Sequence, residues 1–361
     1  MTSPHDPPLH DPNSRGFASD NYAGVHPEVL AALAAANEGH QIAYGEDVYT
    51  ARLLETLREH FGATAEAFPV FNGTGANVTA LTSVLPRWGA VISTSTAHIH
   101  SDEGGAPEKV AGLKLFTIDT PDGKLTPDLI ATQAWGFDDE HRAQPGAVSI
   151  TQTTELGTLY TAVEIRAIAD AAHAHDMALH LDGARIWNAA AALGVPFREF
   201  TTDAGVDVLS FGGTKNGLIG AEAVVVLNPD RVAGMIRLRK TLMQLASKMR
   251  FQSAQLLALF DGGLGLASAG HANAMAARLR SALDELIAAG QAPGLSFSQP
   301  TQANAVFAVL PNDAADRIRE RYRFYDWDRA AGQVRWMTAF DTTEADIDGF
   351  VEAIREELAK G

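Results

Sequence analysis

The sequence has no cysteine among its 361 residues. This absence excludes disulfide frameworks, thiolate nucleophiles and zinc sites built on cysteine. No apolar run approaches the roughly 20 residues needed to span a bilayer. The N-terminus, M-T-S-P-H-D-P-P-L-H-D-P, lacks the basic region and the apolar core of a signal peptide. We therefore expect a folded protein in the cytoplasm, with no membrane segment.

Basic residues are also few, with 28 Lys and Arg against 44 Asp and Glu, and the net charge is -16. A surface with this excess of negative charge repels nucleic acid and anionic membranes, so we expect neither as a partner. Hydrophobic residues make up 46% of the chain, and its length allows a large domain and a smaller one, each with its own core. The acidic charge indicates solubility and does not identify a substrate.

Strand-like runs alternate with helical patterns as far as Phe260. Helices are predicted at residues 27–38, 47–61, 75–85 and 161–176. The last of these opens T-A-V-E, where Thr161 can cap the helix and Glu164 can close a capping box. The alternation is typical of a mostly parallel sheet covered on both faces. The seven predicted strands are residues 67–71, 90–94, 114–118, 146–151, 177–181, 206–211 and 221–227.

The pattern changes after Phe260. A glycine-rich hinge, D-G-G-L-G, leads to a long helix near 272–289, followed by strands at 304–310 and 333–339 and helices at 313–321 and 343–360. We predict an α/β fold, with a large domain built on a mostly parallel seven-stranded sheet and a small C-terminal α+β domain. The predicted parts are an N-terminal arm with the first helix (1–46), the large domain (47–260) and the small domain (261–361).

Residues that carry chemistry follow five of the predicted strands. Because ligands bind beyond the carboxyl ends of the strands in an open α/β sheet, these residues are expected at one edge. Each has an ordinary alternative: the G-T-G turn can be plain, His98 a core histidine and Asp182 a turn cap. Those alternatives do not explain why all five occur together. The set comprises Gly73, Thr74 and Gly75 at a helix start, His98, Glu155, Asp182 with Arg185, and Lys215.

Lys215 lies in V-L-S-F-G-G-T-K-N-G, directly after an apolar strand. A buried ammonium group is costly to desolvate. The lysine is therefore either an exposed residue of an ordinary turn or an amine that is neutral and nucleophilic.

A zinc site is a separate alternative. The stretch H-I-H-S-D-E at 98–103 resembles the H-x-H-x-D-H motif of metallo-β-lactamase-like hydrolases, and in an extended segment His98 and His100 would face the same way and could share a zinc ion. The last position is Glu103 rather than histidine, and no partner motif follows. We therefore favour a site without metal and keep a zinc-dependent hydrolase as an alternative.

Pyridoxal phosphate requires this set of residues. Its aldehyde forms a Schiff base with a lysine, its phosphate needs an anion site, its pyridine nitrogen needs a carboxylate, and its ring is stacked on by a flat side chain. A cation must also hold the carboxylate of an amino-acid substrate. The candidates are, in that order, Lys215; Gly73, Thr74 and Gly75; Asp182; His98; and Arg185 with Arg335.

The sequence resembles the threonine aldolases, in the aspartate-aminotransferase-like (fold type I) group of pyridoxal phosphate enzymes, from about residue 17 to residue 342. The resemblance implies an aspartate-aminotransferase-like large domain. The matching motifs are F-A-S-D-N-Y, A-Y-G-E-D, F-N-G-T-G-A-N, A-H with E-G-G beyond it, L-H-L-D-G-A-R-I-W-N-A, G-G-T-K-N-G and V-R-W. The block H-x-D-G-A-R followed by the lysine segment is the specific part.

The resemblance implies a role for each matching position. Lys215 is the Schiff-base lysine, Asp182 the pyridinium partner and His98 the stacking base, while Gly73 and Thr74 match the phosphate loop. Ser19, Arg185 and Arg335 match residues that hold the substrate carboxylate. Lys240 and Arg250 fall where the family reaches the phosphate of a neighbouring subunit, so a homodimer or homotetramer with shared active sites is implied. Tyr44 matches a tyrosine near the cofactor, although it can equally be a packing residue.

The segment T-T-E-L-G departs from the family, because many members have a histidine where this chain has Glu155. The implied reaction is retro-aldol cleavage of β-hydroxy-α-amino acids (L-threonine, L-allo-threonine and phenylserine) into glycine and an aldehyde. His98, or a water held by Glu155, would remove the hydroxyl proton. The rival hypotheses are a β-eliminating lyase or a transaminase with the same cofactor, and a non-catalytic cofactor-binding protein.

Overall fold

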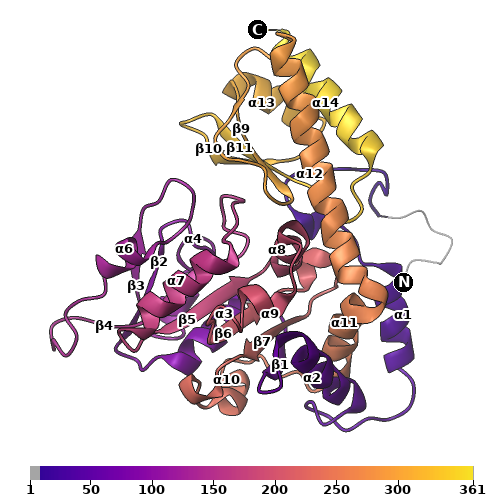
Figure 1. Cartoon of the computed structure of the whole chain (residues 1–361). Coiled ribbons are helices and arrows are strands. Elements are labelled where there is room, and N and C mark those ends of the chain that lie inside the picture. The colour runs from indigo at the N-terminus through magenta and orange to yellow at the C-terminus, as the bar shows by residue number, and fades with distance from the viewer. Residues whose placement is uncertain (1–8, 361) are drawn as a thin grey trace.

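A seven-stranded sheet forms the centre of the larger part of the molecule (Figure 1). The structure is a computed structural model and describes residues 9–360. The strand order is β1-β7-β6-β5-β4-β2-β3, and every strand is parallel to the others except β7, which is antiparallel to both of its neighbours. This confirms the prediction of a mostly parallel, seven-stranded sheet. The strands are β1 (Glu66–Val70), β2 (Gly89–Thr94), β3 (Lys114–Ile118), β4 (Gln144–Thr151), β5 (Ala178–Gly183), β6 (Val208–Phe211) and β7 (Glu222–Val226).

Helices cover both faces of this sheet. Successive residues of a strand face opposite sides, so the buried strands present side chains that must be covered on each face. Leu179 packs toward α7 (Ala162–His173), whereas Ala178 packs on the face covered by α3 (Gly73–Val84). The capping box predicted at Thr161 and Glu164 is present. The other helices of this part are α1 (Pro27–Ala36), α2 (Val48–Phe61), α4 (His98–Ser101), α5 (Ala106–Lys109), α6 (Pro127–Ala131), α8 (Ile186–Leu193), α9 (Phe197–Phe200), α10 (Met235–Thr241) and α11 (Arg250–Phe260), with 3-10 turns η1 (Asp20–Tyr22), η2 (Thr214–Asn216), η3 (Pro229–Arg231) and η4 (Asp261–Gly263).

A smaller α+β unit follows at the C-terminus. Its antiparallel sheet has the order β10-β11-β9-β8, with β8 (Ser296–Phe297), β9 (Ala305–Val309), β10 (Tyr325–Asp328) and β11 (Gln333–Met337). Of these strands, sequence patterns predicted only the two long ones. Helices α13 (Asn312–Arg319) and α14 (Glu344–Leu358) pack beside it.

Helix α12 (Leu264–Ala288) joins the two units and is longer than predicted. Figure 1 shows it running from α11 to the far end of α14. It begins directly after Gly262 and Gly263, whose φ angles of 58° and 76° end the preceding turn. No proline lies between Leu264 and Ala272, and the helix accommodates Gly265 and Gly270, so it starts eight residues before the predicted position. The predicted domain boundaries at residues 46 and 260 stay predictions.

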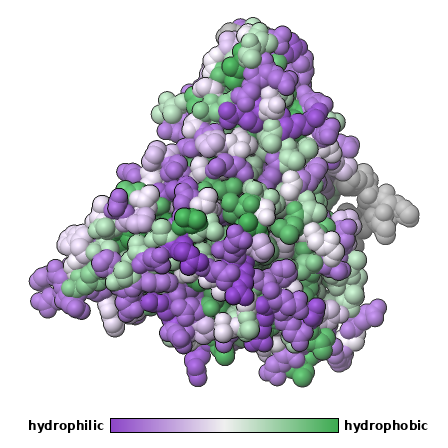
Figure 2. Space-filling view, viewed as in Figure 1, coloured by the Kyte–Doolittle hydropathy of each residue, from purple (hydrophilic) through white to green (hydrophobic). Residues whose placement is uncertain are grey.

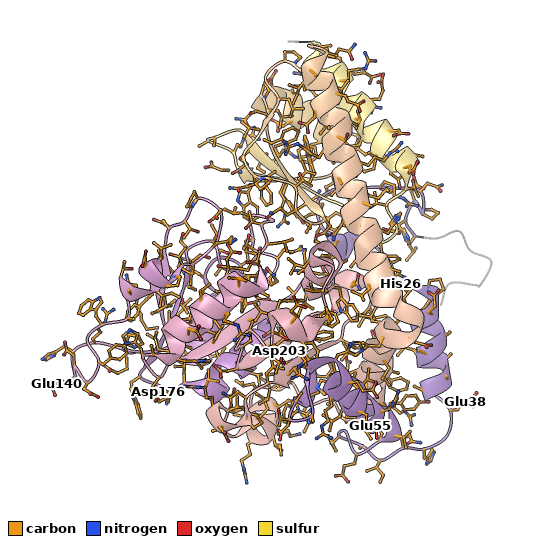
Figure 3. The ribbon with its side chains drawn as sticks, viewed as in Figure 1. His26, Glu38, Glu55, Glu140, Asp176 and Asp203 are labelled. Atoms are coloured by element: carbon orange, nitrogen blue, oxygen red, sulfur yellow. The ribbon has the colours of Figure 1, made fainter. Side chains whose placement is uncertain are left out.

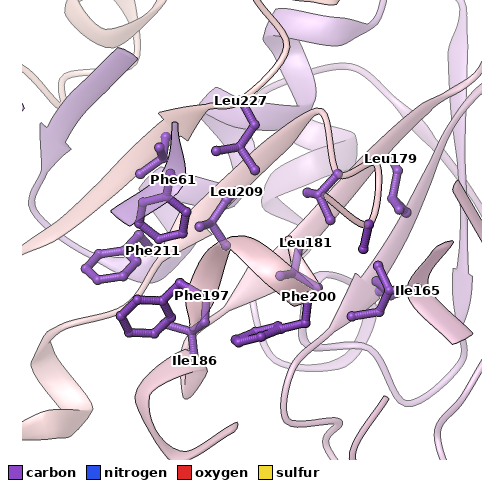
Figure 4. Packing of buried hydrophobic residues seen from close by; sticks show 14 of the residues in the cluster. Phe61, Ile165, Leu179, Leu181, Ile186, Phe197, Phe200, Leu209, Phe211 and Leu227 are labelled. Carbon is purple, nitrogen blue, oxygen red and sulfur yellow. The ribbon is translucent and has the colours of Figure 1, made fainter. Parts of the chain in front are cut away.

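Two hydrophobic cores correspond to the two units. In the larger one, aromatic rings from distant segments pack together, and Figure 4 shows Phe61, Phe197 and Phe211 among them. In the smaller one, the Phe17 ring stacks on Phe350 with centroids 4.1 Å apart. Part of the predicted N-terminal arm is therefore buried against the C-terminal unit, while its first eight residues lie outside the described residues.

The molecular surface is mostly polar on the face shown in Figure 2, with hydrophobic residues scattered among hydrophilic ones. Several carboxylates are exposed, and Figure 3 labels five of them, Glu38, Glu55, Glu140, Asp176 and Asp203. Within residues 9–360, no helix is long and apolar enough to cross a membrane.

The Phe61 ring tests the larger core. Phe61 is fully buried between Phe197 and Phe211, so Phe61→Ala is expected to lower the free energy of unfolding by about 3–5 kcal/mol. Chemical unfolding followed by tryptophan fluorescence measures the change. The control is Val163→Ala, at a side chain that is 78% exposed, for which a change within about 0.5 kcal/mol is expected. A loss equal to that of the control would contradict the packing described.

Candidate active site

A cavity of about 380 Å³ lies where β5 and β6 end and α3 begins. Its size falls within the usual range for small-molecule sites. Its wall includes five of the predicted residues, namely Gly73, Thr74, His98, Asp182 and Lys215. A larger hollow of about 700 Å³ borders residues 10–24 and Arg323. None of the five predicted residues that line the smaller cavity lies in the wall of this hollow. Chemistry rather than volume therefore identifies the smaller cavity as the candidate site.

The start of α3 is built to receive an anion. Asn72 caps the helix, with its Oδ1 accepting from the Gly75 N–H at 2.7 Å. The first N–H groups of a helix lack intrahelical partners and carry its positive dipole end, and Gly73 and Thr74 present theirs at the cavity wall. A Cβ on Gly75 would lie 2.3 Å from the Gln244 side chain, so this close approach requires glycine.

Asp182 and His98 are joined through one amide. Asn77 Nδ2 donates to Asp182 Oδ2 at 2.9 Å and to Glu103 Oε1 at 2.7 Å, and the same Glu103 oxygen lies 2.9 Å from His98 Nδ1. Asp182 Oδ1 also accepts from the Ala184 N–H at 3.0 Å. Both groups are thereby fixed at the cavity wall. Sequence reasoning missed Asn77 altogether and assigned Glu103 no role, although N-G-T-G-A-N and the E-G-G after A-H contained both.

The hydrogen bond between His98 and the Glu103 carboxylate raises the pKa of His98 above its ordinary value, against the effect of burial. The charges of Glu155 and Asp182 raise this pKa further. His98 begins the short helix α4, so His100, two positions later, points elsewhere and is exposed. The extended geometry on which the zinc alternative rested is therefore absent. Within the described part of the chain, no group of three or more His, Cys, Asp or Glu side chains could hold a metal ion.

Arg185 is held by a buried carboxylate. Its Nε and Nη2 donate to the two oxygens of Asp20 at 2.7 and 2.9 Å, and Asn304 Nδ2 donates to the same carboxylate at 3.1 Å. Burial alone would raise the pKa of Asp20, but the Arg185 guanidinium outweighs it and holds that pKa below its ordinary value. Asp20 and Asn304 were not predicted, because each lies far from Arg185 in the sequence.

Arg335, Ser19 and Glu155 lie beside this pair rather than in the wall around Lys215. Arg335 is half-buried; its Nη2 donates to the Ala18 carbonyl at 3.3 Å, and its buried Nε has no partner among the described residues. Burial and the Arg185 charge lower its pKa. Ser19 Oγ accepts from the Asn21 N–H at 3.2 Å. Glu155 is buried, and its charge raises the pKa of Arg185 as well as that of His98.

Two glycines, Gly212 and Gly213, follow β6, and the 3-10 turn η2 begins directly after them. Lys215 is the second residue of η2. A Cβ on Gly212 would lie 2.5 Å from the Ala184 carbonyl oxygen, and one on Gly213 would lie 2.6 Å from that of Ala221. The chain can therefore turn between β5 and β7 only because these residues are glycine, and the turn brings Lys215 into the cavity.

The remaining predicted residues lie outside the cavity wall. Lys240 is exposed, and its Nζ lies 5.3 Å from the centre of the Tyr44 ring. Tyr44 is itself 51% exposed. Arg250 Nη1 donates to the Gly39 carbonyl at 3.3 Å. The fold thus brings Lys240 and Tyr44 together, but on the surface.

The residues of the cavity fit pyridoxal phosphate. The wall combines an amine, a fixed carboxylate, an imidazole and a helix start with free N–H groups, which is the donor set that this cofactor needs. The Oε2 atom of Glu103 and the Oδ1 atom of Asn77 are buried without partners among residues 9–360, so hydrogen-bonding capacity remains beside the cavity.

Comparison with known proteins agrees with this site. Residues 16–310 match the family described as beta-eliminating lyase. The chain is 41% identical over 344 residues to the low specificity L-threonine aldolase of a Pseudomonas species, covering 95% of this chain and 97% of that one, and 42% identical over 346 residues to that of Pseudomonas aeruginosa, with the same coverages. A solved threonine aldolase from Leishmania major superposes with a TM-score of 0.88 at 28% identity, covering 95% of this chain and 99% of that one.

The chain therefore belongs to the beta-eliminating lyase family of fold type I pyridoxal phosphate enzymes, and within it to the threonine aldolases. It is a lyase that depends on pyridoxal phosphate. The family, the fold class, the enzyme class and the cofactor inferred from the sequence are confirmed.

The contact between Glu103 and His98 leads to a prediction about the pKa of the His98 imidazole. Because this hydrogen bond is the largest cause of the raised pKa of His98, Glu103→Gln is expected to lower that pKa, as measured by NMR of the imidazole signals. In the wild-type protein, the contribution of this pair to the stability of the fold is complete at pH values below 6.5, the ordinary pKa of histidine. It is lost as the pH rises through the raised pKa of His98. The exposed neighbour gives the control, Asp102→Asn, which should leave the titration nearly unchanged. An unshifted His98 in Glu103→Gln would refute the assignment.

Proposed function

We propose that this protein is an aldolase that cleaves β-hydroxy-α-amino acids into glycine and an aldehyde. The proposed substrates are L-threonine, L-allo-threonine and phenylserine. The observation that carries the proposal is the meeting of Lys215, Asp182, His98 and the α3 start in one cavity, with two guanidinium groups beside it. The names of the most similar relatives, low specificity L-threonine aldolases, support the same activity.

The proposed cofactor contacts follow from the wall of the cavity. Lys215 supplies the amine that bonds to the aldehyde carbon, Asp182 pairs with the pyridine nitrogen, His98 stacks on the ring, and Gly73 and Thr74 hold the phosphate. When bound, pyridoxal phosphate supplies an electron sink for the Cα–Cβ bond that breaks. Asn77 keeps the Asp182 carboxylate oriented, so that its charge favours a protonated pyridine nitrogen.

Arg335 is the guanidinium best placed to hold the substrate carboxylate. Two donors of Arg185 are already used by Asp20, whereas Arg335 has only one protein hydrogen bond among the described residues and an unpartnered, buried Nε. Arg185, through its remaining N–H donors, and the Ser19 hydroxyl complete the proposed subsite. The carboxylate clamp matters because orientation of the amino acid decides which of its bonds stands perpendicular to the cofactor ring and breaks.

The proton of the β-hydroxyl requires an acceptor. His98 can accept it at Nε2, because its Nδ1 is occupied by Glu103, but only in the neutral form that the raised pKa disfavours. The buried Glu155 carboxylate, acting through a water, is the second candidate. We propose that these two residues share the task, with Glu155 in the place of the family's more usual histidine.

We also propose that the active protein is a homodimer or homotetramer. Lys240 and Arg250 fall where the family reaches the phosphate of a neighbouring subunit, and Tyr44 matches a tyrosine near the cofactor; here all three lie outside the chain's own cavity wall. In a shared site, Lys240 and Arg250 would reach the phosphate bound by the partner copy, where positive charge is favourable.

Product analysis tests the proposed reaction. Purified protein supplemented with pyridoxal phosphate is expected to convert L-threonine into equal amounts of glycine and acetaldehyde. Lys215→Ala is expected to lose both the activity and the visible absorbance of the lysine-bound cofactor, because no other residue of the cavity wall offers an amine. L-allo-threonine and phenylserine, tested in parallel, define the substrate range. A keto acid with ammonia instead of glycine would indicate a β-eliminating lyase or a transaminase.

Arg335 offers a second test. A hydrogen bond to a charged group contributes about 1.5–3 kcal/mol, so Arg335→Ala is expected to raise KM for the amino acid roughly 10- to 100-fold. The cofactor should still bind, since Arg335 lies outside the cavity wall. Arg321→Ala, at an exposed arginine paired with Glu356, is the matched control and should leave KM unchanged. An unaltered KM in Arg335→Ala would remove this residue from the substrate subsite.

A further inference from the structure

Glu222 is a buried carboxyl group of the same cavity that the proposed reaction does not use. It is the first residue of β7, only 7% exposed, and it pairs with Val70, the last residue of β1. Because β7 alone runs antiparallel, its first residue lies at the edge where the parallel strands end. The direction of one strand therefore places an acid beside Lys215, and both line the cavity.

The Glu222 carboxyl group holds the turn that carries Lys215. Oε2 accepts from the Gly213 N–H at 2.7 Å and Oε1 from the Thr214 N–H at 3.3 Å, which are the two residues preceding the lysine. These bonds tie the turn after β6 to the start of β7. Glycine at position 213 allows the approach, since a Cβ there would clash with the Ala221 carbonyl.

The charges around Glu222 single out Lys215. Burial raises the pKa of Glu222 to about 7, and the bonds from Thr214 and Gly213 together with the Lys215 charge act in the opposite direction. Across the cavity, β5 contributes Asp182 and α4 contributes His98, but the charge of Lys215 has the largest charge effect on this carboxyl group.

The strands and helices behind Glu222 add one charged group. Arg239 of α10 donates through Nη1 to the Pro69 carbonyl of β1, at 3.4 Å. Among the charged groups of the described residues, Lys215 has the largest effect on the pKa of Glu222.

We propose that Glu222 positions Lys215 and exchanges a proton with its amine. This inference rests on the proposed function, in which the Lys215 nitrogen is alternately bonded to carbon and free. When the nitrogen is released as an amine, the Glu222 carboxylic acid gives it the O–H proton, which leaves a carboxylate beside an ammonium group. When Lys215 must act as a nucleophile again, the proton returns to Glu222 and the amine is neutral. No other reactant is required.

A carboxyl group suits this task better than an amide of the same shape. An amide could accept one of the two backbone N–H bonds, but it could neither take the proton nor stabilise the ammonium group. A purely structural clamp would therefore tolerate glutamine with a general loss of rate, whereas a proton partner would not. The two possibilities differ in how the reactivity of Lys215 depends on pH.

The experiment measures bond formation between Lys215 and the cofactor rather than turnover. Protein freed of cofactor is mixed with pyridoxal phosphate, and the rate of the absorbance change is recorded from about pH 6 to about pH 11, a range that brackets the ordinary pKa values of histidine and lysine. Glu222→Gln removes the negative charge that favours the ammonium form. The midpoint of the rate profile should then move down by about 1 pH unit, the lower end of the effect of a close opposite charge.

Two further variants complete the design. Glu222→Asp keeps the charge but withdraws it by one methylene, so a smaller shift in the same direction is expected, and it tests the proposal even if the glutamine variant does not fold. Glu66→Gln removes one exposed negative charge from the opposite end of the same strand pair, where Glu66 lies opposite Val226, and should leave the midpoint in place.

The outcomes separate this inference from the proposed function. Slower bond formation with an unmoved midpoint in both Glu222 variants would overturn the proton-exchange role. A shift of equal size in Glu66→Gln would also overturn it, because the effect would then be one of net charge. If the wild-type protein forms no bond with pyridoxal phosphate at Lys215, the proposed function itself fails.

Discussion

The buried ion pair between Arg185 and Asp20 is the interaction on which the candidate site depends. Arg185 follows β5 of the large sheet, Asp20 begins η1 in the N-terminal segment, and Asn304, which also bonds Asp20, directly precedes β9 of the small unit. Three parts of the chain therefore meet at one carboxylate. Removing one partner of such a pair leaves an uncompensated buried charge at a cost of about 3–5 kcal/mol, so the pair fixes how the two units lie at the site.

This ion pair also determines what Arg335 can do. The Asp20 carboxylate is satisfied by Arg185 and Asn304, and the nearby Arg335 guanidinium has only the Ala18 carbonyl as a hydrogen-bond partner among the described residues. The Arg335 guanidinium therefore presents its positive charge and unused N–H donors next to the cavity. That charge favours an anionic group of a ligand, and a guanidinium holds a carboxylate in a defined plane. The structural ion pair and the proposed substrate subsite are thus parts of one electrostatic arrangement.

The sequence predicted those features that depend on local pattern. Alternating strands and helices defined the sheet, and the rule that ligands bind at the carboxyl ends of strands brought Gly73, Thr74, His98, Asp182 and Lys215 to one cavity. Contacts across long separations were not visible: Asn77 and Asp182 are 105 positions apart, and Arg185 and Asp20 are 165 apart. No local pattern encodes such pairings.

Strand direction and short helices were the other features that the sequence left undetermined. An apolar run such as β7 has the same composition whether it is parallel or antiparallel, so the sequence did not place Glu222 at the functional edge. The stretch H-I-H-S was interpreted as extended for the zinc alternative, yet it forms a single helical turn. Four residues are too few for a periodic pattern to distinguish the two conformations.

Glu155 connects these electrostatic features to the departure from the family pattern. A histidine at this position would be neutral or cationic near two guanidinium groups, whereas glutamate adds a negative charge that both Arg185 and His98 sense. The same charge that balances the guanidinium groups also favours the protonated form of His98. An imidazolium can stack on a ring and donate a proton, but it cannot accept one. In the proposed reaction, Glu155 in place of the family's more usual histidine would make His98 less available as the base and would at the same time supply a carboxylate, acting through a water, to take over that role.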